Sequence, residues 1–288
     1  MNNLKIYCMC LENKYLEKVQ SLDYIPVGLK NKNFSEDWLL DNTLKNISEK
    51  NSYYGEYTFY YWYWKNMLKN KRYDEWVGFC SYRELWGNKK VIENKNSIDS
   101  LLQNLPAEWQ KYEAIIGEPF FLERPGLSKI LKYGKIALLK NYKETFKSKF
   151  SIKFQFDMFH GNGILDKAIN LLPTKDKDDF NYYVKNHVSL NQGNMFVCRS
   201  TKIIDNYFSE VFDWLEKCEK IFGFNLQGHR KVRMYTVCTH IDKDGRFSKN
   251  TGQKSLGKLH TAEFRGWKRL QCVMDLLGTN HATLDAAD

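Results

Sequence analysis

The amino-acid sequence predicts an α/β fold, in which a central mixed, mostly parallel β-sheet is flanked by helices. Two observations support this prediction. Short apolar segments typical of buried strands alternate with helical segments as far as residue 222, and this order is characteristic of a sheet covered by helices on both faces. The length of 288 residues also suffices for one large core. We expect this domain to span residues 1–245, followed by a basic loop and a C-terminal helical extension over residues 246–288.

Five apolar segments are expected to form the strands. LKIYCMC at residues 4–10 is apolar on both faces, as a strand inside a parallel sheet is. Pro26 argues against a helix at residues 24–29 and favours an extended segment there. The other three segments are short apolar runs bounded by charged or turn-forming residues. They are residues 75–82, residues 112–121, which Pro119 ends, and residues 193–199.

Helices are expected where apolar residues recur at helical spacing or follow a capping residue. The clearest case is residues 203–222, where Ile204, Phe208 and Leu215 belong to one apolar stripe. Ser52 can cap an aromatic-rich helix over residues 53–68. The remaining expected helices are 97–105, the part of 157–172 that follows Gly163, 176–185 and 261–277, and loops are expected at 31–52 and 245–259.

Basic residues are concentrated near the C-terminal end. The formal net charge is +10, and between Arg246 and Arg269 there are seven Lys or Arg residues and a single acid, Glu263. A basic surface attracts nucleic acid, anionic lipid or phosphorylated small molecules. The expected helix at 261–277 carries Phe264 and Trp267 beside basic residues, which suits peripheral contact with a membrane. Packing of this helix against the domain is the alternative.

The composition also indicates the compartment. Seven cysteines, an odd number without a second pair at zinc-ribbon spacing, indicate reduced and mostly buried thiols. No apolar run approaches the roughly 20 residues that a membrane-spanning helix needs, and residues 1–14 have too short an apolar core for a secretory signal. We therefore expect a cytoplasmic protein, with peripheral attachment at the inner face of the cell membrane as the further expectation.

Several familiar catalytic motifs do not occur in the sequence. GxGxxG after the first strand, GxxxxGK[ST], GxSxG and HExxH are all missing, which disfavours Rossmann, P-loop, serine hydrolase and zinc peptidase sites. Asp-x-Asp, which can hold a divalent ion against a diphosphate, occurs twice. Asp176 and Asp178 open an expected helix, where acids also favour the dipole. Asp242 and Asp244 follow an apolar stretch, but Asp-Gly is also a turn signal. We leave a Mn²⁺ or Mg²⁺ cofactor open.

Candidate ligand-binding residues lie beside the strand ends, because ligands of α/β sheets sit beyond the carboxyl edge. Tyr82 and Arg83 follow the strand at 75–82, and an arginine there can meet a phosphate through two N–H groups. His160 lies beside Asp157 and ahead of a helix, where it can act as a base or a polar binding residue. Asn194 belongs to an amide-rich turn before a strand. The alternatives are an Arg83 ion pair, a buried structural His160 and a plain turn.

Several segments together resemble one known family. They are DNTLKNISEKNSYYGEYTFYYWYWKN, VGFCSYRELW, YEAIIGEPF, FQFDMFHGNGILD and NQGNMFVCRSTKIIDNYFSEVFDWL. Each is similar to a block of the capsular and O-antigen polysaccharide glycosyltransferases, long filed as a domain of unknown function, whose better-known members transfer galactofuranose. The likeness extends over about residues 4–222.

The resemblance implies a GT-A-like fold and a glycosyltransferase activity. The donor would be a UDP-sugar carrying a hexose, with a furanose such as galactofuranose as one possibility, and the acceptor would be a growing cell-surface polysaccharide or oligosaccharide on a lipid carrier. Transfer would invert the anomeric carbon. The polar positions that match the family are Asn42, Asn46, Asn51, Glu56, Thr58, Lys65, Asn66, Tyr82, Arg83, His160, Asp166 and Asn194.

Roles follow for part of this set. Arg83 and Lys65 would lie near the diphosphate, and Asn51, Glu56 and Thr58 would hold the donor. The aromatic rings between residues 53 and 64 would hold their helix rigid while its polar residues face the donor pocket. His160 and Asp157 would face the acceptor.

The sequence also departs from the family pattern. Ser81 and Glu84 stand where the family has His and Arg, and the glutamate expected after the last strand is missing. The base is therefore open among His240, Asp242 and Asp157. A catalytically inactive carbohydrate- or lipid-binding protein on the same fold is the alternative function. No stacking motif or reader helix supports a nucleic-acid partner.

Overall fold

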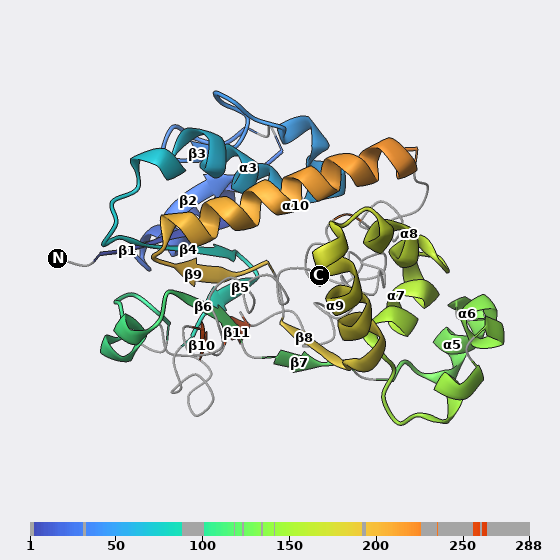
Figure 1. The fold of residues 1–288 in the computed structure, drawn as a ribbon. Coiled ribbons are helices and arrows are strands. Elements are labelled where there is room, and N and C mark those ends of the chain that lie inside the picture. The colour runs from blue at the N-terminus through green and yellow to red at the C-terminus, as the bar shows by residue number, and fades with distance from the viewer. Residues whose placement is uncertain are drawn as a thin grey trace, which may run out of the picture.

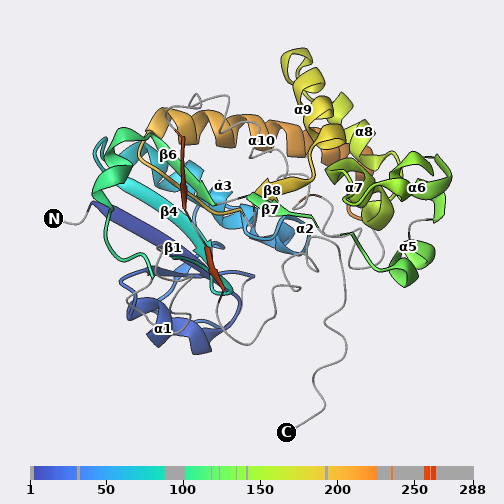
Figure 2. The same cartoon turned by 90° about the horizontal axis from the view of Figure 1, so that it is seen from below.

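The computed structural model is an α/β fold built on a nine-stranded sheet (Figure 1). It describes residues 3–30, 33–87, 101–117, 119–122, 124–133, 135–140, 142–191, 194–225, 235, 256–259 and 261–263. The predicted central sheet flanked by helices is confirmed, since helices cover both faces in Figures 1 and 2.

The sheet is mixed and mostly parallel, and most of its strands end at one edge. The strand order is β10-β6-β9-β4-β1-β2-β3, and β5 pairs with both β4 and β11. The strands are β1 (Leu4–Cys10), β2 (Ile25–Gly28), β3 (Leu39–Leu40), β4 (Trp76–Ser81), β5 (Glu84–Trp86), β6 (Ala114–Gly117), β9 (Phe196–Cys198), β10 (Leu256–Leu259) and β11 (Thr261–Glu263). β9 is antiparallel to both of its neighbours, so β1, β2, β3, β4 and β6 all end at the same carboxyl edge.

Two helices cover one face of the sheet. α3 (Tyr57–Asn66) and α10 (Thr201–Phe222) pack there, with Tyr60 and Phe208 against Phe79 of β4. Because a helix that leads back to a parallel strand runs opposite to it, α3 begins at the carboxyl edge and ends near the amino edge. The opposite face carries α1 (Leu16–Gln20), as Figure 2 shows, and a second apolar cluster around Trp38 and Trp109.

A helical unit is inserted at the carboxyl edge. The chain leaves β6 through β7 (Pro119–Phe121) and returns to β9 through β8 (Ser189–Asn191), and these two strands pair with each other. Between them lie α5 (Leu127–Tyr133), α6 (Lys135–Lys140), the 3₁₀ helix η6 (Tyr142–Phe146), α7 (Ile152–His160), α8 (Ile164–Asn170) and α9 (Thr174–Asn186). Both views place this unit beside the sheet, with α5 and α6 at its outer end (Figures 1 and 2).

The predicted aromatic helix is divided in two. α2 (Asn51–Tyr54) ends at Gly55, which has φ 56° and ψ −131°, and α3 follows. This backbone conformation is open to glycine and strained for other residues, so Gly55 ends one helix and lets the next begin. Other differences are smaller. Residues 101–105 of the expected helix at 97–105 are not helical, and the expected strand at 112–121 is split between two sheets.

The C-terminal prediction is wrong where the structure describes it. Residues 256–259, expected in a loop, form β10 beside β6, and residues 261–263, expected to open a helix, form β11 beside β5. The physical reason is that the edges of β6 and β5 offer unpaired backbone N–H and C=O groups, which can recruit a segment regardless of its side-chain pattern. Residues 264–277 of the expected helix lie outside the described residues.

Two expectations from composition can be compared with the structure. Cys8, Cys10, Cys80, Cys198 and Cys218 are buried and form no disulfide, as expected for reduced thiols. Among the helices in the described ranges, none combines the length and the apolar character needed to cross a bilayer.

Candidate functional site

The candidate site lies at the carboxyl edge of the sheet, where polar residues from separate elements meet. Asp41 directly follows β3, and the turn of Tyr82 and Arg83 follows β4. Asn194 precedes β9, and the pairing of Phe79 with Phe196 places it at the same edge as the end of β4. The N-terminal end of α3 also lies here, because the Thr58 hydroxyl contacts Asp41 and the Tyr60 hydroxyl contacts the Asn194 backbone.

Asp41 is joined to the start of α3 by a buried hydrogen-bond network. The Thr58 hydroxyl donates to Asp41 Oδ2 at 2.6 Å. Asn51 Nδ2 donates to the Thr58 hydroxyl and to the Gly55 carbonyl, both at 2.9 Å. Asp41, Asn51 and Thr58 are all buried, so this network fixes the α2–α3 junction on the end of β3. The structure therefore brings the predicted residues Asn51 and Thr58 together.

The Asp41 carboxyl group has an unusual electrostatic environment. Burial raises its pKa to about 6, although the Thr58 hydrogen bond and the backbone N–H groups of Lys30 and Asp41 act in the opposite direction. Asp41 Oδ1 is buried and makes no hydrogen bond of ordinary geometry within the described structure. Buried polar atoms are normally paired, so an acceptor of this kind suits a ligand hydroxyl or N–H.

Asp41 was not among the sequence-predicted site residues. It opens the quoted segment DNTLKNIS, but the sequence predicted only a loop over residues 31–52. The two-residue strand β3, which places Asp41 at the edge, is too short to show a pattern.

Asn194, like Asp41, has buried polar side-chain atoms at this edge of the sheet. Its side chain is 4% exposed, and neither Oδ1 nor Nδ2 has a hydrogen-bond partner within the described structure. Its backbone carbonyl accepts from the Tyr60 hydroxyl, which fixes the position of the residue. A carboxamide offers both a donor and an acceptor, so Asn194 is suited to a ligand hydroxyl.

An aromatic pair and a guanidinium group occupy the turn after β4. The rings of Tyr82 and Tyr15 lie 4.5 Å apart between centroids, and the Tyr82 N–H donates to the Met9 carbonyl at 3.0 Å. The Arg83 guanidinium lies 5.6 Å from the centroid of the Tyr82 ring. Burial raises the pKa of the Tyr82 hydroxyl, while the Arg83 charge lowers it. All three side chains are half-buried, which leaves part of their surface open to a ligand.

Other predicted donor residues lie elsewhere or serve local structure. Lys65 is in the last turn of α3, about 10 Å along the helix axis from Thr58, and its Nζ lies 3.0 Å from the centroid of the Trp64 ring. The structure therefore places Lys65 away from the carboxyl edge, and its approach to the diphosphate stays a prediction that a Lys65 variant can test. Glu56, half-buried, precedes the first residue of α3, and its carbonyl accepts from the N–H groups of residues 59 and 60.

Two predicted asparagines hold the loop between β3 and α2. Asn46 Nδ2 donates to the carbonyls of residues 43 and 44, and its Oδ1 accepts from Ser48. Asn66 Nδ2 donates to the carbonyls of residues 45 and 62 at 2.9 and 2.8 Å. Both amides are therefore engaged in the fold of this loop.

Asp157 and His160 lie on α7 in the helical unit, apart from Arg83 on the sheet. Asp157 Oδ2 accepts from Lys153 Nζ at 2.8 Å, and Oδ1 accepts from the Gly163 N–H at 3.2 Å. Lys153 also contacts Asp166 at 2.7 Å, so these three charges clamp α7 to α8. Burial raises the pKa of Asp157 and Lys153 opposes the rise. His160 is buried, with its ring centroid 4.7 Å from that of Phe156.

One of the two Asp-x-Asp motifs lies within the described residues. Asp176 and Asp178 lie in the first turns of α9 in the helical unit. The described residues contain no group of three or more His, Cys, Asp or Glu side chains that could hold a metal ion. Asp242 and Asp244, with the candidate base His240, lie outside the described residues.

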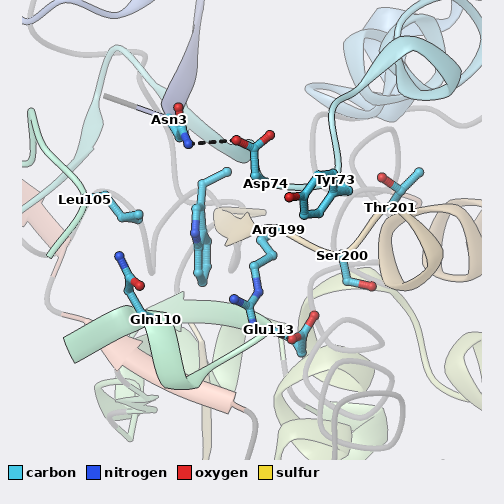
Figure 3. Close-up of a pocket in the computed structure, with 10 residues that line it drawn as sticks. Asn3, Tyr73, Asp74, Leu105, Gln110, Glu113, Arg199, Ser200 and Thr201 are labelled. Carbon is cyan, nitrogen blue, oxygen red and sulfur yellow. Dashed lines mark hydrogen bonds and ion pairs between the residues drawn. The ribbon is translucent and has the colours of Figure 1, made fainter. Parts of the chain in front are cut away.

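A cavity of about 560 Å³ opens at the opposite, amino edge of the sheet (Figure 3). Glu113 and Arg199 form an ion pair in it, and the Arg199 guanidinium lies 5.7 Å from the centroid of the Trp76 ring. Asn3 donates to Asp74 at 3.0 Å on another wall. Trp76 opens β4 and Arg199 directly follows β9, so this cavity is separate from the edge that carries Asp41 and Asn194.

The fold is that of an α/β protein with a helical unit inserted at the carboxyl edge of its central sheet. The fold is similar to the apo structure of WbbM, described as a bifunctional glycosyltransferase, with a TM-score of 0.63 and 16% sequence identity. The match covers 92% of this chain and 46% of WbbM, so the chain spans less than half the length of that protein. The chain belongs to the family described as Domain of unknown function (DUF4422), whose model matches residues 5–239. No curated protein matches the chain.

Proposed function

We propose that the chain is a GT-A-like glycosyltransferase that transfers a hexose from a UDP-sugar to a growing cell-surface polysaccharide. The observation that carries this proposal is a set of buried polar atoms at the carboxyl edge of the sheet that have no hydrogen-bond partner of ordinary geometry among the described residues. They are Asp41 Oδ1 and both amide atoms of Asn194. Ligands of α/β sheets bind at this edge. The shared fold with WbbM, described as a bifunctional glycosyltransferase, supports the same reading.

The donor would be held by groups of complementary chemistry. The Tyr15 and Tyr82 rings offer a surface on which a nucleotide base can stack. Arg83, beside them, can bind the diphosphate through two parallel N–H groups. Asp41 Oδ1 can accept from a donor hydroxyl or N–H, and the Asn194 amide can both donate to and accept from a sugar hydroxyl.

In the transfer, an acceptor hydroxyl oxygen bonds to the anomeric carbon while the bond from that carbon to the diphosphate oxygen breaks. Because attack comes from the face opposite the leaving UDP, the configuration inverts. The acceptor proton moves to a base, for which His160 is our candidate among the described residues. Arg83 stabilises the negative charge that develops on UDP. Asp157, with both oxygens already bonded, positions the turn after His160.

The acceptor and compartment follow from the same proposal. The protein would encounter a growing capsule or O-antigen chain on a lipid carrier at the inner face of the cell membrane, so we propose a cytoplasmic protein attached there peripherally.

We retain a Mn²⁺ or Mg²⁺ ion as an open part of the proposal. Activity that persists in excess chelator would show that no exchangeable ion takes part.

The test is UDP release from a panel of UDP-sugars with oligosaccharide acceptors. The wild type should release UDP in an acceptor-dependent way, and Asn194→Ala should lower kcat/KM by about tenfold or more, because a buried hydrogen bond to the sugar is lost. Asn170→Ala, on an exposed turn of α8, is the matched control and should remain within about twofold.

A ligand screen separates this activity from the alternative function. A thermal-shift screen of nucleotides and sugar nucleotides detects ligands that bind the folded protein. Binding of a UDP-sugar without UDP release for any donor and acceptor pair would favour the inactive binding protein. A lack of both binding and release across the panel would reject the nucleotide-sugar proposal itself.

A further inference from the structure

The outer helices of the helical unit expose an unusual number of large apolar side chains. Leu127 and Leu131 of α5 are 69% and 61% exposed, and Ile136 and Leu139 of α6 are 63% and 83% exposed. We call these four residues the α5–α6 apolar face. Phe121 and Tyr142 beside them in the chain are also exposed. More than half of the exposed large apolar residues in the described part of the chain fall in this one stretch.

This exposure is not explained by the packing of the helices. α5 and α6 are anchored to α7 through Ile130 and Leu138, which contact a cluster containing Phe150 and Phe154. Leu127 and Leu131 are four residues apart and Ile136 and Leu139 three apart, so each pair lies along one side of its helix. The helices therefore have an inner apolar side that packs and an outer one that does not. Large apolar side chains that are exposed together in one segment usually mark a surface for a partner.

The segment that carries the apolar face is also strongly basic. Between Arg124 and Lys149 the sequence has eight Lys or Arg residues and a single acid, Glu144. Arg124, Lys135, Lys143, Lys147 and Lys149 are exposed in the structure. Lys149 Nζ lies 4.4 Å from the centroid of the Phe121 ring, which places a cation directly beside exposed apolar surface. Glu144, the single acid between Arg124 and Lys149, is paired with Lys147.

Exposed aliphatic side chains in a lysine-rich segment match one environment closely. At the surface of an anionic bilayer, apolar groups enter the boundary between headgroups and acyl chains while lysines reach the lipid phosphates. Each basic residue near such a surface adds attraction that salt weakens. A second copy of the same cationic face would repel this one. An acidic protein would match the charge, but exposed apolar side chains among this many lysines fit the headgroup layer of a membrane better.

We propose that the α5–α6 apolar face docks the protein on anionic phospholipid membranes. Figures 1 and 2 place α5 and α6 at the outer end of the helical unit, so the face can meet a membrane without hindrance from the sheet. The membrane contact proposed for the α5–α6 apolar face is distinct from the one expected for residues 261–277. The proposed docking does not depend on the proposed transferase activity.

The experiment is co-sedimentation of the full chain with vesicles of phosphatidylcholine alone or mixed with the anionic lipid phosphatidylglycerol. The protein should bind the mixed vesicles, and binding should weaken by about tenfold or more when salt rises from about 0.1 to 0.5 M. The double variant Ile136→Glu/Leu139→Glu should lose about tenfold or more in affinity. The matched control is Ile221→Glu, at a residue of α10 that is 59% exposed, and it should stay within about twofold.

Folding and oligomerisation are checked on the same samples. Because the substituted residues are exposed, the double variant should melt within a few degrees of the wild type. A second double variant, Lys135→Gln/Lys143→Gln, tests the charge without altering the apolar face and should also weaken binding. The proposal is overturned if the wild type does not bind anionic vesicles, or if both double variants bind as the wild type does. Self-association through this face, detected by sedimentation velocity without vesicle binding, would overturn it as well.

Discussion

Replacing Asp41 with asparagine gives a quantitative test of the buried carboxylate at the carboxyl edge. The pKa of Asp41 rises from 3.8 to about 6 because the side chain is buried. Since its folded-state value lies above its unfolded value, the folded protein binds the proton more tightly. Stability therefore falls as pH rises from about 4 to 6, and the full cost of burying the ionised group is present above about pH 6. At 1.36 kcal/mol for each pKa unit, that cost is about 3 kcal/mol.

The variant Asp41→Asn removes this charge and keeps a similar shape and an acceptor for Thr58. It should therefore be more stable than the wild type above about pH 6, by up to about 3 kcal/mol, which for a chain of this length is about 5 °C in Tm. The two proteins should converge below about pH 4. The same variant should bind UDP-sugars more weakly, because an acceptor for the ligand is replaced.

The assay is thermal unfolding followed by circular dichroism at a series of pH values for both proteins. Asp37→Asn, at an exposed position in the same segment, is the control and should leave the profile within about 1 °C. Parallel pH profiles for wild type and Asp41→Asn would refute the reasoning, since the carboxyl group would then carry no electrostatic cost.

Three further predictions concern other parts of the fold. Gly55→Ala should lower stability by about 1–3 kcal/mol, because φ 56° with ψ −131° strains a side chain, and urea denaturation measures the loss. Lys153→Met should cost about 3 kcal/mol by leaving Asp157 buried and unpaired, and adding Asp157→Asn should restore part of it. Lys65→Ala should leave kcat/KM for UDP-sugar transfer within about twofold, whereas Arg83→Ala should lower it by about tenfold or more.

Each of these predictions has a result that contradicts it. An unchanged urea midpoint for Gly55→Ala would show that the α2–α3 junction tolerates a side chain. Equal loss in the single Lys153 variant and the double variant would mean that the clamp acts through packing rather than charge. A large loss of transfer on Lys65→Ala would place that lysine in the site after all.

The sequence predicted the central architecture because strong local patterns determined it. β1 and β4 are continuous apolar runs that occupy the middle of the sheet, and α10 carries the clearest apolar stripe in the chain. Two strands that lack a local apolar pattern were not predicted. β10 and β11 form by pairing with the edges of β6 and β5, and the local sequence pattern does not predict such pairing.

The candidate site shows the same division. Asn51 and Thr58 were singled out as polar residues in an aromatic segment, and the structure joins them in one network. Their partner Asp41 was missed because the strand that positions it has only two residues. Lys65 was grouped with them by sequence proximity, but the direction of α3 carries it to the opposite edge of the sheet. The residue types predicted which buried side chains need hydrogen-bond partners. Only the topology of the fold shows which of these side chains lie close together.

The most direct test of the central claim, that a nucleotide-sugar binds at the carboxyl edge, is a calorimetric titration of a UDP-sugar into three proteins. These are the wild type, Asn194→Ala at the carboxyl edge and Gln110→Ala in the cavity at the amino edge. We predict that the UDP-sugar binds the wild type, that Asn194→Ala raises Kd by about tenfold or more because the hydrogen bond to the sugar is lost, and that Gln110→Ala stays within about twofold. The opposite pattern, with Gln110→Ala weakened and Asn194→Ala unchanged, would contradict the account and place the ligand at the other edge of the sheet.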